Sequence, residues 1–79
     1  MESVCEVVGF EQIISEESGE VAGIRIYAQR PLSSEVIGEG IESVRIYINT
    51  KYVKYEPQLG DKIVAITNDR GYVERIIKF

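Results

Sequence analysis

Two segments in which apolar and polar residues alternate constrain the fold of this chain more than any other feature. Residues 21–28 place isoleucine or alanine at every second position from Ile24, and residues 41–49 place valine or isoleucine at every second position from Val44. A period of two residues is that of a β-strand with one buried face, whereas a helix repeats every 3.6 residues. The alternation therefore predicts two half-buried strands.

The rest of the chain also predicts short strands separated by turns. Residues 3–14 are rich in valine, isoleucine and phenylalanine and contain Gly9, which predicts a long first strand bent at its middle. Such a strand can serve both halves of a small barrel. A polar turn is expected over residues 15–20. Near the C-terminus, residues 61–67 and 71–79 flank a short loop that ends in glycine, a pattern typical of a hairpin with a bulged turn.

Two longer connections separate these strands. Residues 29–40 contain a proline, paired serines and two glycines, and we expect Val36 and Ile37 either to extend a flanking strand or to cap the barrel. Residues 50–60 allow two interpretations. Thr50 can cap one short helical turn, or the segment can follow an extended path.

Five strands and no long helical pattern predict an all-β fold. A chain of 79 residues has room for one small domain, which we place at residues 1–79. The regular turn spacing predicts a small five-stranded barrel. The bent first strand favours an OB-like barrel, and an SH3-like barrel is the alternative.

The residue inventory excludes several kinds of chemistry. The sequence contains no histidine and a single cysteine, Cys5. A Ser-His-Asp or Cys-His nucleophile, a histidine-containing zinc site and an internal disulfide are therefore excluded. The glycines form neither a P-loop nor a dinucleotide-binding motif. We expect a protein that is not an enzyme and that uses no cofactor and no metal.

The sequence also bears on location. No segment approaches the roughly 18 consecutive apolar residues of a membrane span, and the N-terminal residues lack the basic start and apolar run of a signal peptide. Cys5 lies in an apolar stretch and is expected to be reduced and buried. These features predict a cytoplasmic protein without a membrane partner.

A short repeat carries the strongest functional signal. Residues 24–27 (Ile-Arg-Ile-Tyr) recur as residues 44–47 (Val-Arg-Ile-Tyr). Because the isoleucines face the core, the arginines and tyrosines share the outward face. Tyrosine rings stack on unpaired bases and guanidinium groups neutralise phosphates, so the pattern predicts binding of single-stranded nucleic acid. The candidate binding residues are those of the repeat and the lysines and tyrosines that follow it: Arg25, Tyr27, Arg45, Tyr47, Lys51, Tyr52, Lys54 and Tyr55.

The repeat is also compatible with two further roles. Tyrosine and arginine are common on exposed sheet faces, because cross-strand pairs between them stabilise a sheet by about 0.2–1 kcal/mol each. The same residue types are also favoured in protein–protein hot spots. The face is therefore a structural surface, a nucleic-acid site or a protein interface.

The charge is divided unevenly along the chain. The formal net charge is −4, and residues 1–20 contain six glutamates and no lysine or arginine. Residues 21–79 contain nine basic and seven acidic side chains, a net charge of +2. This division predicts a molecule with one acidic edge and one modestly basic, tyrosine-bearing face. The glutamates of residues 16–20 are expected to form a solvated turn or a contact for a basic partner.

The layout of residues 23–27, 59–61 and 68–71 resembles that of small phage and plasmid single-stranded-DNA-binding proteins of the filamentous-phage helix-destabilising type. The resemblance implies an OB-like homodimer that binds strands cooperatively through Arg25, Tyr27 and their counterparts in the second repeat. Because one core of this size supplies only about 3–5 kcal/mol, oligomerisation is also expected on grounds of stability. The sequence departs from this type in being acidic. The alternative function is an accessory module of phage or plasmid type that binds a host or partner protein.

Overall fold

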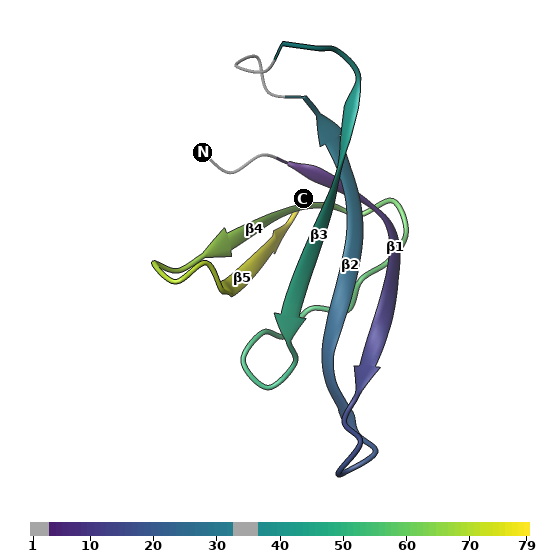
Figure 1. The fold of residues 1–79 in the computed structure, drawn as a ribbon, viewed down its shortest axis with the longest axis vertical. Coiled ribbons are helices and arrows are strands. Elements are labelled where there is room, and N and C mark those ends of the chain that lie inside the picture. The colour runs from purple at the N-terminus through teal and green to yellow at the C-terminus, as the bar shows by residue number, and fades with distance from the viewer. Residues whose placement is uncertain (1–3, 33–36) are drawn as a thin grey trace.

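The computed structural model describes residues 4–32 and 37–79, and within these ranges the chain forms one antiparallel sheet of five strands and no helix. The all-β prediction is confirmed. The strand order across the sheet is β3-β2-β1-β4-β5 (Figure 1). The strands are β1 (Cys5–Ile14), β2 (Val21–Pro31), β3 (Ile41–Asn49), β4 (Lys62–Thr67) and β5 (Val73–Lys78).

Strand β1 joins the two parts of the sheet. It pairs with β2 over most of its length, and it pairs with β4 only at Cys5 and Glu6. The register with β2 shifts between Val7 and Gly9, so that Val8 is the extra residue of a bulge. A bulge bends the strand and increases its twist. The bend predicted near Gly9 is therefore confirmed, while Ser3, the first residue of the predicted strand, lies outside the described residues.

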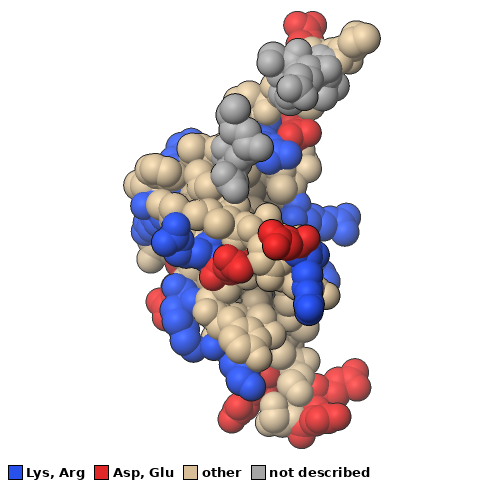
Figure 2. Space-filling model, turned by 90° about the vertical axis from the view of Figure 1, so that its left-hand side faces the viewer, with Lys and Arg blue, Asp and Glu red and all other residues tan. Residues whose placement is uncertain are grey.

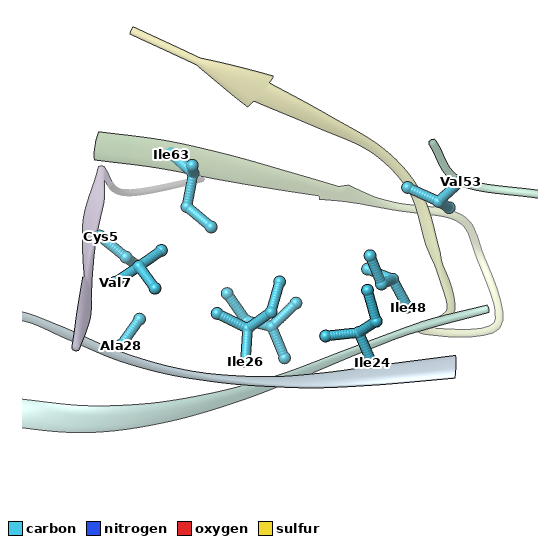
Figure 3. Close-up of a cluster of buried hydrophobic side chains, with 9 residues drawn as sticks. Cys5, Val7, Ile24, Ile26, Ala28, Ile48, Val53 and Ile63 are labelled. Carbon is cyan, nitrogen blue, oxygen red and sulfur yellow. The ribbon is translucent and has the colours of Figure 1, made fainter. Parts of the chain in front are cut away.

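The bend brings the β4–β5 hairpin over the inner face of β1, β2 and β3. Strands β3 and β5 come into contact but do not pair, so the sheet is strongly curved and not closed. Figure 3 shows Ile63 of β4 pointing into the core from the side opposite Ile26 of β2. The buried apolar side chains are Cys5, Val7, Ile24, Ile26, Ala28, Ile46, Ile48, Val53 and Ile63. The expected burial of Cys5 and of the alternating isoleucines is confirmed.

The connection predicted over residues 29–40 is shorter than expected. Strand β2 continues to Pro31, because its ladder with β3 runs on to a pairing of Pro31 with Ile41. The proline stands at the last residue of the strand, where its missing N–H disrupts the ladder least. Val36 lies outside the described residues. Ile37 is fully exposed, so its predicted role in a strand or a cap is wrong.

The segment from residue 50 to residue 60 forms a turn and then crosses the inner face without regular structure. The amides of Tyr52 and Val53 donate to the carbonyl of Asn49 at 3.0 and 2.9 Å, and the Asn49 side chain accepts the amide of Lys51 at 2.9 Å. An asparagine turn of this kind competes with a helix start. The predicted helical turn capped by Thr50 is therefore wrong. The irregular path of this segment buries Val53 against the core.

The C-terminal hairpin predicted from the sequence is confirmed. Gly71 closes the turn with a φ of +84°, and the register between β4 and β5 shifts at Ile66 and Thr67. Positive φ favours glycine at this position. Asn68 organises the turn, since its side-chain oxygen accepts the amides of Arg70 and Tyr72 at 2.9 and 3.0 Å.

One polar contact ties the irregular segment to the start of β4. The Tyr55 hydroxyl donates to Asp61 at 2.6 Å in a half-buried setting, and the amide of Gln58 donates to the same carboxylate. The Tyr55 hydrogen bond, aided by the Gln58 amide and Lys78, lowers the pKa of Asp61 below its ordinary value. Burial, with the negative charge of Asp61 beside it, raises the pKa of Tyr55.

This contact predicts an acid-dependent contribution to stability. A carboxyl group whose pKa is lowered by folding stabilises the fold above its ordinary pKa, and this stabilisation is lost as the pH falls through the lowered value. Tyr55→Phe is expected to reduce the free energy of unfolding at pH 7 and to flatten its decrease between about pH 5 and pH 3. Urea unfolding at a series of pH values measures both effects. Tyr52→Phe, at a ring that is 73% exposed, is the control, and identical pH profiles for the two variants would contradict the assignment.

Candidate nucleic-acid interface

The repeated Arg-Ile-Tyr segments form a compact cluster on the outer face of β2 and β3. The register pairs Arg25 with Tyr47 and Tyr27 with Arg45. Neighbours across an antiparallel pair lie on the same face, and the intervening isoleucines are buried. The prediction that the four side chains share the outward face is therefore confirmed. We call these four residues the Arg/Tyr face.

Two glycines make room for the tyrosine rings on this face. A Cβ atom added to Gly23 would lie 2.6 Å from Cζ of Tyr47, which shows that this ring lies directly against the Gly23 backbone. A Cβ atom added to Gly9 would lie 3.8 Å from Cδ2 of Tyr27. Neither glycine has a positive φ. Glycine is therefore required at position 23 because a larger side chain would overlap the Tyr47 ring. The backbone conformation there is one that other residues can also adopt.

A glutamate from β1, which is absent from the predicted set of binding residues, occupies the Arg/Tyr face. Glu11 pairs with Arg25 in the sheet register. Its Oε1 accepts hydrogen bonds from Arg25 Nη1 at 2.7 Å and from the Tyr27 hydroxyl at 2.8 Å. The Tyr27 bond first, then Arg25 and the nearby charge of Arg45, lowers the pKa of Glu11 below its ordinary value. The alternation of Gly9, Glu11 and Ile13 is the signal that places this carboxylate on the outer face.

The acidic groups are therefore not confined to one edge. Figure 2 shows acidic side chains gathered at the lower end of the molecule, over the β1–β2 turn, with lysine and arginine spread over the middle of this side and single acidic groups between them. Glu6 and Glu11, both from the acidic first 20 residues, form ion pairs with Lys62 and Arg25. The predicted acidic edge is therefore limited to residues 16–20, because Glu6 and Glu11 of β1 face basic partners from other strands.

Three tyrosines from separate parts of the chain surround a cleft at the end of the Arg/Tyr face. Tyr47 of β3, Tyr52 of the following turn and Tyr72 before β5 line a hollow of about 500 Å³, together with Asn49 and Asn68. Tyr52 and Tyr72 are 73% and 68% exposed. Tyr72 is absent from the predicted set of binding residues. No local signal marks it, because its position beside Tyr47 results from the approach of the β4–β5 hairpin to β3.

The lysines and the last tyrosine of the candidate set are placed differently. The Lys51 ammonium lies 5.7 Å from the centre of the ring of Tyr52, which lines the cleft. The Lys54 ammonium donates to the carbonyl of Thr50 at 2.9 Å. Tyr55 packs against the core on the inner side of the sheet. The structure thus keeps Lys51 and Tyr52 near the Arg/Tyr face and separates Tyr55 from it.

Among residues 4–32 and 37–79, no three metal-ligating side chains are grouped as a metal site would require, and no helix is long and apolar enough to cross a membrane. No family model matches the chain, and neither a curated protein nor a solved structure shows significant similarity to it. Function must therefore be inferred from the geometry of the Arg/Tyr face and the tyrosine cleft.

The two glycines provide a matched test of this geometry. Gly9→Ala is expected to keep the Tyr27 ring in place and to stabilise the strand by about 0.5–1 kcal/mol, because alanine loses less backbone entropy on folding. Gly23→Ala is expected to displace the Tyr47 ring, since the new methyl group would overlap it. The ring-current shift of the residue 23 backbone resonances, measured by NMR, reports the ring position. An unchanged shift in Gly23→Ala would show that Tyr47 does not lie against the strand.

Proposed function

We propose that this protein binds single-stranded nucleic acid, without strong sequence preference, on the outer face of β2 and β3. The observation that carries the proposal is the Arg/Tyr face, on which two arginines and two tyrosines lie in cross-strand pairs. Stacking on an aromatic side chain contributes about 1–3 kcal/mol per base and tolerates any base, since every base has a flat π-face. Arginine adds charge for the phosphates and can stack as well.

The topology supports an OB-like barrel as the scaffold for this function. The bent β1 lies between β2 and β4, and β3 approaches β5 without pairing. This arrangement agrees with a partly open five-stranded barrel, and OB-folds bind oligonucleotides on the face of strands two and three and on the adjoining loops. We favour an OB-like barrel over the SH3-like alternative because β1 pairs both with β2 and with β4 of the β4–β5 hairpin. The tyrosine cleft lies beside the β4–β5 loop, where it extends the proposed path of the strand.

The role we propose is non-enzymatic and cytoplasmic, like that of the small phage and plasmid proteins that the sequence resembles. Single-stranded nucleic acid would follow the Arg/Tyr face toward Tyr52 and Tyr72, with Lys51 beside the Tyr52 ring. The acidic turn at residues 16–20 lies at the tip of the β1–β2 hairpin (Figure 1), at the same end of the molecule as the turn that carries Lys51 and Tyr52, because Thr50 bonds to the carbonyls of Val21 and Ala22. Its repulsion of phosphates there would weaken with added salt.

A second candidate function is a protein-interaction module, and one observation favours it. Arg25 and Tyr27 already hold a carboxylate, that of Glu11, in two hydrogen bonds. An acidic segment of a partner protein would meet the same donors. The two candidate functions can be distinguished, because only nucleic-acid binding requires bases that stack on the tyrosine rings.

The first test uses tyrosine substitution and a fluorescent oligo-dT strand. Tyr27→Ala and Tyr47→Ala are each expected to weaken binding by about five- to a hundredfold, since each removes one stacked base. Fluorescence anisotropy at several salt concentrations measures the affinity and its salt dependence, which should be steep. Phe79→Ala, at an exposed aromatic residue outside the Arg/Tyr face, should bind as the wild type does. Equal affinity for all variants would contradict the proposal, and capture of a protein partner after nuclease treatment would favour the interaction module.

The second test concerns Glu11, whose carboxylate lies on the Arg/Tyr face. If phosphate competes with Glu11 for Arg25 and Tyr27, then Glu11→Gln should raise the affinity for oligo-dT by about two- to fivefold, the range expected for an exposed ion pair. Glu16→Gln makes the same charge change on the exposed β1–β2 turn and should raise the affinity less. The same anisotropy titration compares the two variants. Equal effects would mean that only net charge matters and that Glu11 does not compete with the ligand.

A further inference from the structure

Strand β1 has a free edge over more than half of its length. On the side away from β2, its pairing with β4 ends at Glu6, and the last backbone contacts on this side join Val7 to Asp61 and Gly60 at 2.9 and 2.8 Å. From Val8 to Ile14 no other strand of the described chain pairs with this edge. Figure 1 shows this lower part of β1 at the outer border of the sheet.

The free edge has few of the features that normally prevent edge-to-edge association. Such edges are usually short or carry bulges, charged residues or proline, whereas residues 8–14 contain one bulge, at Val8, one charged residue, Glu11, and no lysine or proline. The exposed fractions of Val8, Phe10 and Ile14 are 44%, 44% and 50%. A free edge of this length with exposed apolar side chains is suited to pairing with another strand.

We propose that two copies of this chain associate by antiparallel pairing of residues 8–14 of β1. The only charged side chain in this stretch, Glu11, is bound to Arg25 of its own sheet. In this pairing Glu11 of one copy lies opposite Glu11 of the other, and the ion pair of each with its own Arg25 offsets the repulsion between them. When two identical edges pair in antiparallel fashion about a two-fold axis, they match each other in length and in residue pattern. An isologous dimer requires this kind of self-complementarity.

The large share of apolar side chains that are exposed supports a second copy of the chain as the partner of the β1 edge. In the described chain, nine apolar side chains are buried and twelve large ones are exposed. A core this small is marginal alone, and association is one common way for a short chain to gain stability. The added strand pairing would bring exposed apolar side chains of both copies, among them Val8 and Ile14, into cross-strand contact.

The pairing would also unite the two proposed binding surfaces. Because the two-fold axis of an in-sheet antiparallel pair is perpendicular to the sheet, both outer faces lie on the same side. The order β3-β2-β1 would continue into β1-β2-β3 of the second copy. Two Arg/Tyr faces would then flank the pair of central strands, where a single oligonucleotide could contact both at a high effective concentration.

The test is the oligomeric state in the absence of nucleic acid, so its outcome is independent of the proposed function. Sedimentation equilibrium of the wild type should give twice the chain mass of 8.9 kDa. Phe10→Lys, which places a charge on the edge of each copy, should give the single chain mass with an unchanged circular dichroism spectrum. Ile41→Lys, at an apolar residue 67% exposed on β3, is the matched control and should remain dimeric. A monomeric wild type, or a dimer that Phe10→Lys leaves intact, would overturn the proposal.

Hydrogen exchange provides a measurement without substitution. If the edges pair, backbone amides on the free side of residues 8–14 should exchange more slowly at high protein concentration than at low concentration. The amides of β4 and β5, which pair within one copy, should show no such dependence beyond the general gain in stability. Concentration-independent exchange along the β1 edge would exclude this interface even if the protein dimerises elsewhere.

Discussion

The structure depends on the pairing of one strand, β1, with neighbours on both sides. Its first residues pair with β4, and most of its length pairs with β2. The bulge at Val8 turns the strand between these partners, so that the β4–β5 hairpin lies over the inner face and covers Val7 and Ile26. Without this turn the apolar faces of the two parts could not meet. The free lower edge of β1 follows from the same bend, because β4 leaves the strand after Glu6.

The outer face is organised by contacts that leave its side chains partly exposed. Tyr47 lies against Gly23 and keeps about half of its surface exposed. The pair formed by Arg25 and Glu11 is exposed, and exposed ion pairs contribute only about 0–1 kcal/mol. Arg25 is therefore positioned by Glu11 without being strongly held. A face of this kind would be ordered before it met the proposed nucleic-acid ligand.

Several features could be predicted from the sequence because they depend on neighbouring residues. The alternation around Ile26 and Ile46 determined which side chains are buried, and the turn ending in Gly71 marked the last hairpin. Other predictions failed where a different contact prevailed. The ladder with β3 extended β2 to Pro31, and the side chain of Asn49 organised the turn in place of a helix cap at Thr50. The extension of β2 depends on which strands become neighbours, which local propensity does not specify.

The sequence by itself determined the all-β class, the bend of the first strand and the common outward face of Arg25, Tyr27 and their counterparts. These follow from the two-residue period of a strand and the glycine that interrupts it, which are local properties of the backbone. Only the tertiary structure decided that Glu11 bonds to this face's Arg25 and Tyr27, that Tyr72 completes the cleft beside Tyr47, and that Tyr55 turns inward to Asp61. The physical reason is that each of these contacts links separate elements of the chain, brought together by the curvature of the sheet and the packing of its core.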